Sequence, residues 1–284
     1  MSRIEELRAR AKRYADRAEE MRGEHGSVDA IFVIADRDVD VGGGMMSGAL
    51  AYRLFIWLLP FALVVVGGIG LAASASSESA AKAVHAMGLT GIVSNSIAEA
   101  SHGTSRWYAI VIGLPILVWA TRSLLKAIVV VHRLVWGDLR RSVPKPSLKA
   151  TFLLLAFLVA YFLIRELSRW VGIWTGSVLL RILVGVALVT VWWLLLSWRL
   201  PHRQSRLLDL APGAVVIGVG LEVLSDVGTY FIAPRVASSQ TTYGALGLAA
   251  TLLFGLYVVS RLIVASAVVN VTLWERRVGT DAAP

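Results

Sequence analysis

The sequence predicts an all-α membrane protein, a polytopic bundle of about six transmembrane helices with both ends in the cytoplasm. First, the 284 residues are 56% apolar and 17% charged, whereas soluble domains are roughly 45–50% apolar and about 25% charged. Second, the apolar residues lie in runs that approach the roughly 20 residues needed to cross a bilayer. Third, most basic residues lie in alternate connections between these runs, which is the positive-inside pattern of membrane proteins.

Residues 1–44 are predicted to form a cytoplasmic arm and linker. Residues 3–22 are rich in Ala, Glu and Arg with opposite charges three and four apart, which favours a solvated helix. They lack the apolar stretch of a signal peptide. Residues 37–44 combine acidic side chains with three consecutive glycines, which favours a linker or a turn into the membrane over a packed element.

The membrane domain is predicted at residues 45–275, followed by a short cytoplasmic tail at 276–284. Its predicted spans are residues 47–73, 107–131, 149–165, 177–198, 210–232 and 245–274. The connection after the first span is rich in Ser and Ala, which favours an external loop with a short interfacial helix at residues 80–97.

The orientation follows from the basic residues, because Lys and Arg next to spans are retained on the cytoplasmic side. The connections and tail predicted inside carry Arg122, Lys126, Arg133, Arg140, Arg141, Lys145, Lys149, Arg199, Arg203, Arg206, Arg276 and Arg277. The connections predicted outside carry fewer, namely Lys82, Arg165, Arg169, Arg181 and Arg235. The three arginines from 165 to 181 depart from the rule, but a cytoplasmic amino terminus remains the better fit.

Composition and motifs argue against several function classes. The chain has no cysteine, which excludes disulfides and thiolate chemistry. The formal net charge is +9, and most of the basic residues lie in the connections between apolar runs, not on a basic face with interleaved aromatics. Membrane lipids and not nucleic acids are therefore the expected partners. Nucleophile, nucleotide-loop and zinc-binding motifs are absent, and the five histidines are scattered. We therefore expect a protein that is not an enzyme, with no catalytic residue, cofactor or metal.

Ionisable residues inside the spans are the candidate functional residues, because a charge at the bilayer centre costs about 2.5–3.5 kcal/mol on insertion scales. Glu222 and Asp226 are four apart, so they share one face of the fifth predicted span. Arg261 lies at a comparable depth in the sixth, which predicts that it pairs with one of them. Arg53 is near a span end, where its side chain is expected to snorkel to the interface.

These residues allow two interpretations. They line a cavity that binds a headgroup or exchanges protons, or they form a structural ion pair that holds two helices in register. Prolines and glycines in the spans favour kinks and close helix packing over a gate. They are Pro60, Pro115, Pro212, Gly67, Gly68, Gly70, Gly213, Gly218 and Gly220.

Three groups of residues are distinctive in their order and spacing. They are Ala49-Leu50-Ala51-Tyr52-Arg53 with Pro60, Arg199-Leu200-Pro201 followed by Pro212-Gly213, and Tyr243-Gly244-Ala245-Leu246-Gly247. On these motifs the chain resembles, from about residue 45 to 277, the YihY/BrkB inner-membrane proteins, once misnamed ribonuclease BN, and more closely their actinobacterial branch. Many family members have a sequence similar to Gly-Ala-Glu-Leu-Asn in the last span. This chain has Val268 in place of the glutamate and retains Asn270, which joins Arg53, Glu222, Asp226 and Arg261 as a candidate intramembrane polar patch.

The resemblance implies about six spans and a loose link to envelope integrity, serum resistance and lipid export. Two functions are compatible with it. The chain is a lipid or small-molecule exporter that uses the charged patch, or it is a non-transporting scaffold that assembles envelope proteins. A cavity lined by the charges favours the exporter, and a solid bundle with paired charges favours the scaffold.

Overall fold

The computed structural model describes residues 26–75, 105–138, 147–203, 205–228 and 233–281, and within these ranges all regular structure is helical. The predicted helices at residues 3–22 and 80–97 lie outside the described residues. The elements are α2 (Gly26–Asp40), α3 (Gly43–Ala75), α6 (Ser105–Val135), α7 (Leu148–Thr175), α8 (Val178–Arg199), η1 (Leu207–Leu210), α9 (Ala211–Val227) and α10 (Ala233–Asp281).

Six segments are long and apolar enough to cross a membrane, which confirms the predicted fold class. They are Gly43–Val65, Ile110–Val135, Leu148–Thr175, Val178–Arg199, Leu207–Val227 and Ala249–Gly279. The third extends furthest beyond its prediction, because α7 continues from its Ser147 cap well beyond residue 165 to Gly176. The prediction ended this span at Arg165, whereas Arg165 lies well within α7.

The interpretation of residues 37–44 as a linker is wrong for its first half. Residues 37–40 are the last turn of α2, which packs against α10. The chain turns at Val41 and Gly42, where Gly42 has φ of 68°, and α3 begins at Gly43. The acidic and glycine residues that resembled a linker are therefore a helix end and a tight turn.

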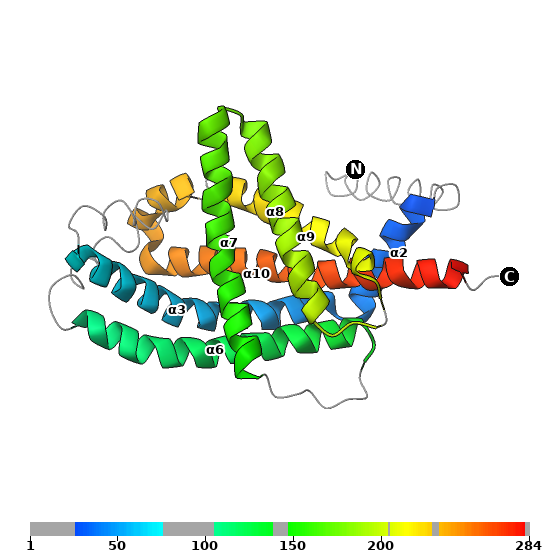
Figure 1. The fold of residues 1–284 in the computed structure, drawn as a ribbon, viewed down its shortest axis with the longest axis horizontal. Helices are drawn as coiled ribbons and strands as arrows, with labels where there is room; N and C mark the ends of the chain where they lie inside the picture. The colour runs from blue at the N-terminus through cyan, green and yellow to red at the C-terminus, as the bar shows by residue number, and fades with distance from the viewer. Residues whose placement is uncertain (1–25, 76–104, 139–146, 204, 229–232, 282–284) are drawn as a thin grey trace, which may run out of the picture.

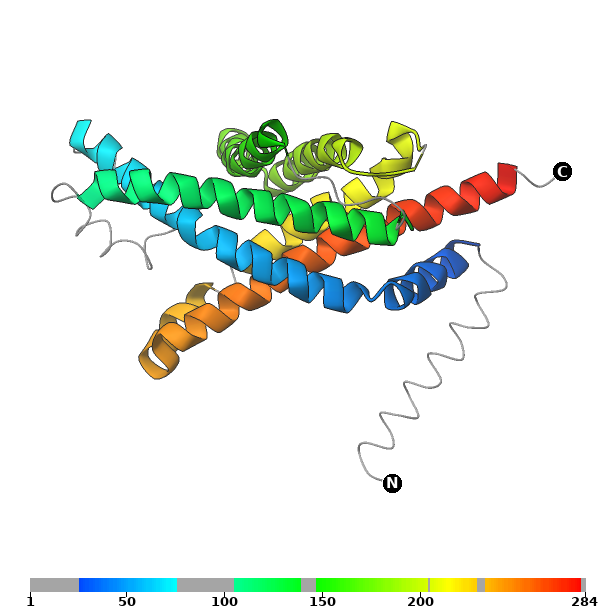
Figure 2. The same cartoon turned by 90° about the horizontal axis from the view of Figure 1, so that it is seen from below.

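The helices fall into two groups that cross steeply. In Figure 1, α3, α6 and α10 run along the long axis, and the α7–α8 hairpin crosses them. Figure 2 shows this hairpin on one side of the three long helices, with the start of α3 and the ends of α6 and α10 toward the same end of the molecule. In the most apolar stretches of α7 and α8, 11% and 17% of the residues are buried, against 39% in α6. The hairpin is therefore the least covered part of the bundle.

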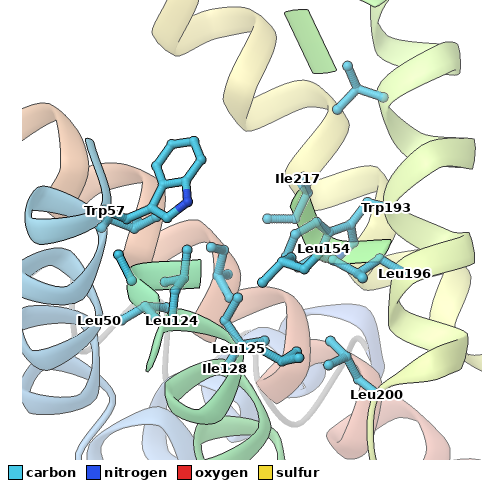
Figure 3. Packing of buried hydrophobic residues seen from close by; sticks show 14 of the residues in the cluster. Leu50, Trp57, Leu124, Leu125, Ile128, Leu154, Trp193, Leu196, Leu200 and Ile217 are labelled. Carbon is cyan, nitrogen blue, oxygen red and sulfur yellow. The ribbon is translucent and has the colours of Figure 1, made fainter. Parts of the chain in front are cut away.

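The largest buried cluster lies where these groups meet. Figure 3 shows Leu50 and Trp57 of α3, Leu124 and Ile128 of α6, and Leu154, Trp193 and Ile217 of the other helices. Two indoles also link helices by hydrogen bonds. Trp57 donates to Thr121 Oγ1 at 2.9 Å, and Trp193 donates to Ser266 Oγ at 3.0 Å. Such bonds between membrane helices stabilise by about 0.6 kcal/mol on average.

Helix α9 packs through two glycines that permit close approach. A Cβ atom on Gly213 would lie 2.6 Å from Asn270 Oδ1 of α10, and one on Gly218 would lie 2.9 Å from the Val186 carbonyl oxygen of α8. The predicted role in packing is thus confirmed at both positions. At Gly68 of α3 a Cβ would meet open space, so close packing does not explain that glycine.

Candidate functional site

Four charged side chains from three helices meet inside the candidate spans, and we call them the intramembrane cluster. Arg165 of α7 donates through Nη1 to Glu222 Oε2 at 2.5 Å. Arg181 of α8 donates to Glu222 Oε1 at 3.1 Å and to both Asp226 oxygens at 3.0 and 3.1 Å. Ser225 accepts a further bond from Arg165. The cluster holds two positive and two negative charges, so it is neutral as a whole.

The cluster is buried at one side and open at the other. The side chain of Glu222 is 3% exposed, and that of Asp226 is 30% exposed. Gly185 of α8 makes room for the buried carboxylate, since a Cβ there would lie 2.9 Å from Glu222 Oε2. Glu222 thus has two guanidinium partners in a confined site, whereas Asp226 has one partner at the surface of the bundle.

The helix periodicity explains why α9 carries both acids. Residues four apart lie on the same face, so Glu222 and Asp226 both meet the α7–α8 hairpin. Each charge is expensive to bury alone, and a paired charge is much less so. Removal of one partner of a buried pair typically costs about 3–5 kcal/mol. The cluster therefore ties the least covered helices to the rest of the bundle.

The predicted pairing of Arg261 with Glu222 or Asp226 is wrong. Arg261 binds Asp38 of α2, with 2.6 Å between Nη1 and Oδ1. A Cβ on Gly220 would contact the side chain of Leu262, so α9 and α10 do bring Glu222 and Arg261 to neighbouring levels. The two side chains nevertheless leave their helices toward different neighbours. The sequence position within each span correctly predicted that the two residues lie at similar depths in the bundle. It could not predict which face of its helix each side chain occupies.

The other two candidate residues lie elsewhere. Arg53 is exposed on α3 and donates to Ser123 Oγ of α6. Asn270 is buried, and its Oδ1 accepts a bond of 2.7 Å from the backbone nitrogen of Gly213, at the start of α9. The five predicted residues therefore do not form one patch. The structure brings together only Glu222 and Asp226.

Sequence reasoning missed Arg165 and Arg181, the two basic members of the cluster. A signal was present, because both belong to the arginines that depart from the positive-inside pattern. The third, Arg169, pairs with Glu166 on the exposed surface of α7 at 3.1 Å. Basic residues on the unexpected side of a span can thus indicate intramembrane partners and not a topology error.

A second set of ion pairs fixes the carboxyl-terminal end of α10, and we call it the α10-end clamp. Arg37 of α2 binds Glu275, with 3.1 Å between Nη2 and Oε1, and Asp29 of α2 accepts a bond of 2.7 Å from Arg276. Arg277 binds Asp209 of η1, with 2.8 Å between Nη2 and Oδ2. The residues predicted to mark a cytoplasmic tail therefore also hold α2 and η1 against α10.

The fold and these charges define a multi-pass α-helical membrane protein whose spans are linked by ion pairs. The family model described as Virulence factor BrkB matches residues 40–284, so the chain belongs to this family. This confirms the family resemblance inferred from the motifs. No curated protein and no solved structure matches the chain. Among the described residues, no three His, Asp or Glu side chains are grouped so as to hold a metal ion.

Proposed function

We propose that this chain acts in the inner or plasma membrane as a non-enzymatic exporter of a lipid or another small molecule, with the intramembrane cluster at its centre. The observation that carries the proposal is the unequal pairing of the two acids. Glu222 is confined between two guanidinium groups, whereas Asp226 is partly exposed and bound to Arg181 alone.

This inequality suits the exchange of an anion. If Asp226 is displaced from Arg181, Arg181 still faces Glu222, and the two arginines then exceed the remaining acid by one charge. An anionic group of the substrate can fill that place without leaving a buried charge unpaired. Guanidinium groups bind phosphate and carboxylate oxygens well, which fits a lipid headgroup.

The alternative is a scaffold that assembles envelope proteins and transports nothing. It is favoured by a different observation, namely that all four charges of the cluster have partners and that Gly185 packs directly on Glu222. In that case the cluster serves only as a strut between helices. The two functions therefore predict different consequences when Asp226, the partly exposed acid, loses its charge.

The substitution Asp226→Asn separates the two functions, with Glu166→Gln as the matched control on the exposed surface of α7. For an exporter, Asp226→Asn abolishes complementation of a deletion strain and alters the leaflet distribution of its lipids, while the melting temperature in detergent is nearly unchanged. Glu166→Gln changes neither. Normal complementation and lipid distribution with Asp226→Asn would leave the scaffold as the better function.

The orientation is part of the proposal and can be measured in the cysteine-free chain. Single cysteines at Ser142 and Thr280 should be protected from an impermeant thiol reagent in intact cells, and cysteines at Ser79 and Ser238 should be labelled. Labelling at Thr280 would overturn the assignment of both ends to the cytoplasm.

A further inference from the structure

A pocket of about 470 Å³ lies where the end of α6 meets the connection after α8. This volume is within the range of about 300–1,000 Å³ that small ligands occupy in proteins. Its walls include Arg133, Trp136, Asp138, His202 and Arg203, and none of these belongs to the intramembrane cluster. The span of α6 ends at Val135, so the pocket lies at the level where a span leaves the apolar layer.

A tight turn at the end of α6 shapes one wall of the pocket. The backbone nitrogen of Asp138 donates to the Arg133 carbonyl at 2.9 Å, and Gly137 between them has φ of 67°. The left-handed conformation at Gly137 closes the helix. A Cβ there would lie 3.2 Å from Arg203 Nη2, so the bare glycine also lets this guanidinium lie close against the turn.

Aromatic contacts hold Trp136 and His202, two further residues of the pocket wall. The ring of Trp136, which is fully buried, lies with its centroid 6.4 Å from that of His202 and 5.7 Å from that of Trp274. His202 Nδ1 is 2.7 Å from the Leu200 carbonyl oxygen, which only accepts, so Nδ1 carries the proton and donates. The imidazole is therefore fixed in orientation beside the two arginines of the pocket.

The pocket is predominantly basic. Arg133 and Arg203 contribute two permanent positive charges, and Asp138 supplies the single acid among the described residues of the wall. Arginine is a preferred donor for phosphate oxygens in proteins, and two arginines line this pocket. Headgroup phosphates also lie at the end of a span, which places such a ligand within reach.

We propose that this pocket binds a phosphate group through Arg133 and Arg203, the phosphate being that of an anionic lipid headgroup or a free phosphate ion. Asp138 weakens the attraction and so limits occupancy to ligands that make both arginine contacts. The site does not depend on the proposed export function, because it shares no residue with the intramembrane cluster. Binding and transport can therefore fail separately.

The test uses the full chain in detergent micelles with equal amounts of phosphatidylglycerol and diacylglycerol, and native mass spectrometry of the lipid retained. We expect wild type to retain phosphatidylglycerol preferentially. Arg203→Gln should lower its affinity about tenfold, which corresponds to the loss of one charge-assisted hydrogen bond. Arg199→Gln is the matched control, since Arg199 is also exposed and is the last residue of α8, shortly before Arg203, but does not line the pocket.

Asp138→Asn provides a gain of affinity that misfolding cannot imitate, because removal of the acid strengthens the field at the phosphate site. A second arm adds inorganic phosphate. If phosphate displaces the lipid, the pocket also takes the free ion, and if it does not, the lipid headgroup is the ligand; both results support a phosphate site. Equal losses with Arg203→Gln and Arg199→Gln, or no gain with Asp138→Asn, would overturn the proposal.

Discussion

The intramembrane cluster and the α10-end clamp use the same chemistry in different surroundings. Both consist of arginine and carboxylate pairs between elements far apart in sequence. The side chain of Glu222 in the cluster is 3% exposed, whereas that of Glu275 in the clamp is 37% exposed. Ion pairs near water contribute about 0–1 kcal/mol, while the loss of one partner from a buried pair typically costs several times more. The difference in burial therefore predicts that the ion pairs of Glu222 stabilise the bundle more than that of Glu275.

The largest expected effect is that of Glu222→Gln, which leaves Arg165 with no acid of the cluster and Arg181 with Asp226 alone. We expect the free energy of unfolding to fall by about 3–5 kcal/mol, because the partly buried guanidinium of Arg165 loses its counter-charge inside the bundle. Thermal unfolding in detergent measures the effect. Glu275→Gln is the matched substitution in the clamp, with an expected loss below about 1 kcal/mol. Losses of equal size would refute the difference in burial as the cause.

The second prediction tests whether disturbed helix packing destabilises the protein as much as the loss of a buried charge. Gly213→Ala places a methyl group 2.6 Å from Asn270 Oδ1, so α9 and α10 must separate. Overpacking of this kind typically costs about 1–3 kcal/mol. At Gly68→Ala the methyl group meets open space, and the better helix propensity of alanine should stabilise by up to about 1 kcal/mol. Melting temperatures that move in the same direction for both variants would contradict this assignment.

Within the clamp, Asp209 should matter more than Asp29. The side chain of Asp209 is 5% exposed and also accepts a bond from the Arg206 nitrogen, whereas that of Asp29 is 31% exposed. We expect Asp209→Asn to cost about 1.5 kcal/mol, the lower end for hydrogen bonds to charged groups. Asp29→Asn should cost less than about 1 kcal/mol. The same unfolding assay compares them, and a larger loss at Asp29 would reverse the ranking.

The smallest effect is the response to salt. From about 0.1 M to 1 M ionic strength the Debye length falls from about 10 Å to about 3 Å, which screens exposed pairs and leaves buried ones nearly unaffected. The penalty of Asp29→Asn should therefore vanish in 1 M salt, while that of Glu222→Gln persists. A Glu222→Gln penalty that disappears with salt would show that water reaches the cluster.

The sequence by itself determined the fold class, the six apolar spans and the family, because hydropathy and short motifs are local properties summed over neighbouring residues. It also indicated that Glu222 and Asp226 share a face, since helix periodicity is local as well. The tertiary structure alone decided their partners. Arg165 lies 57 residues from Glu222, and Asp38 lies 223 residues from Arg261. Hydropathy gives the depth of a charged side chain but not its direction around the helix. The pairs are therefore fixed by how α7, α8 and α2 pack against α9 and α10.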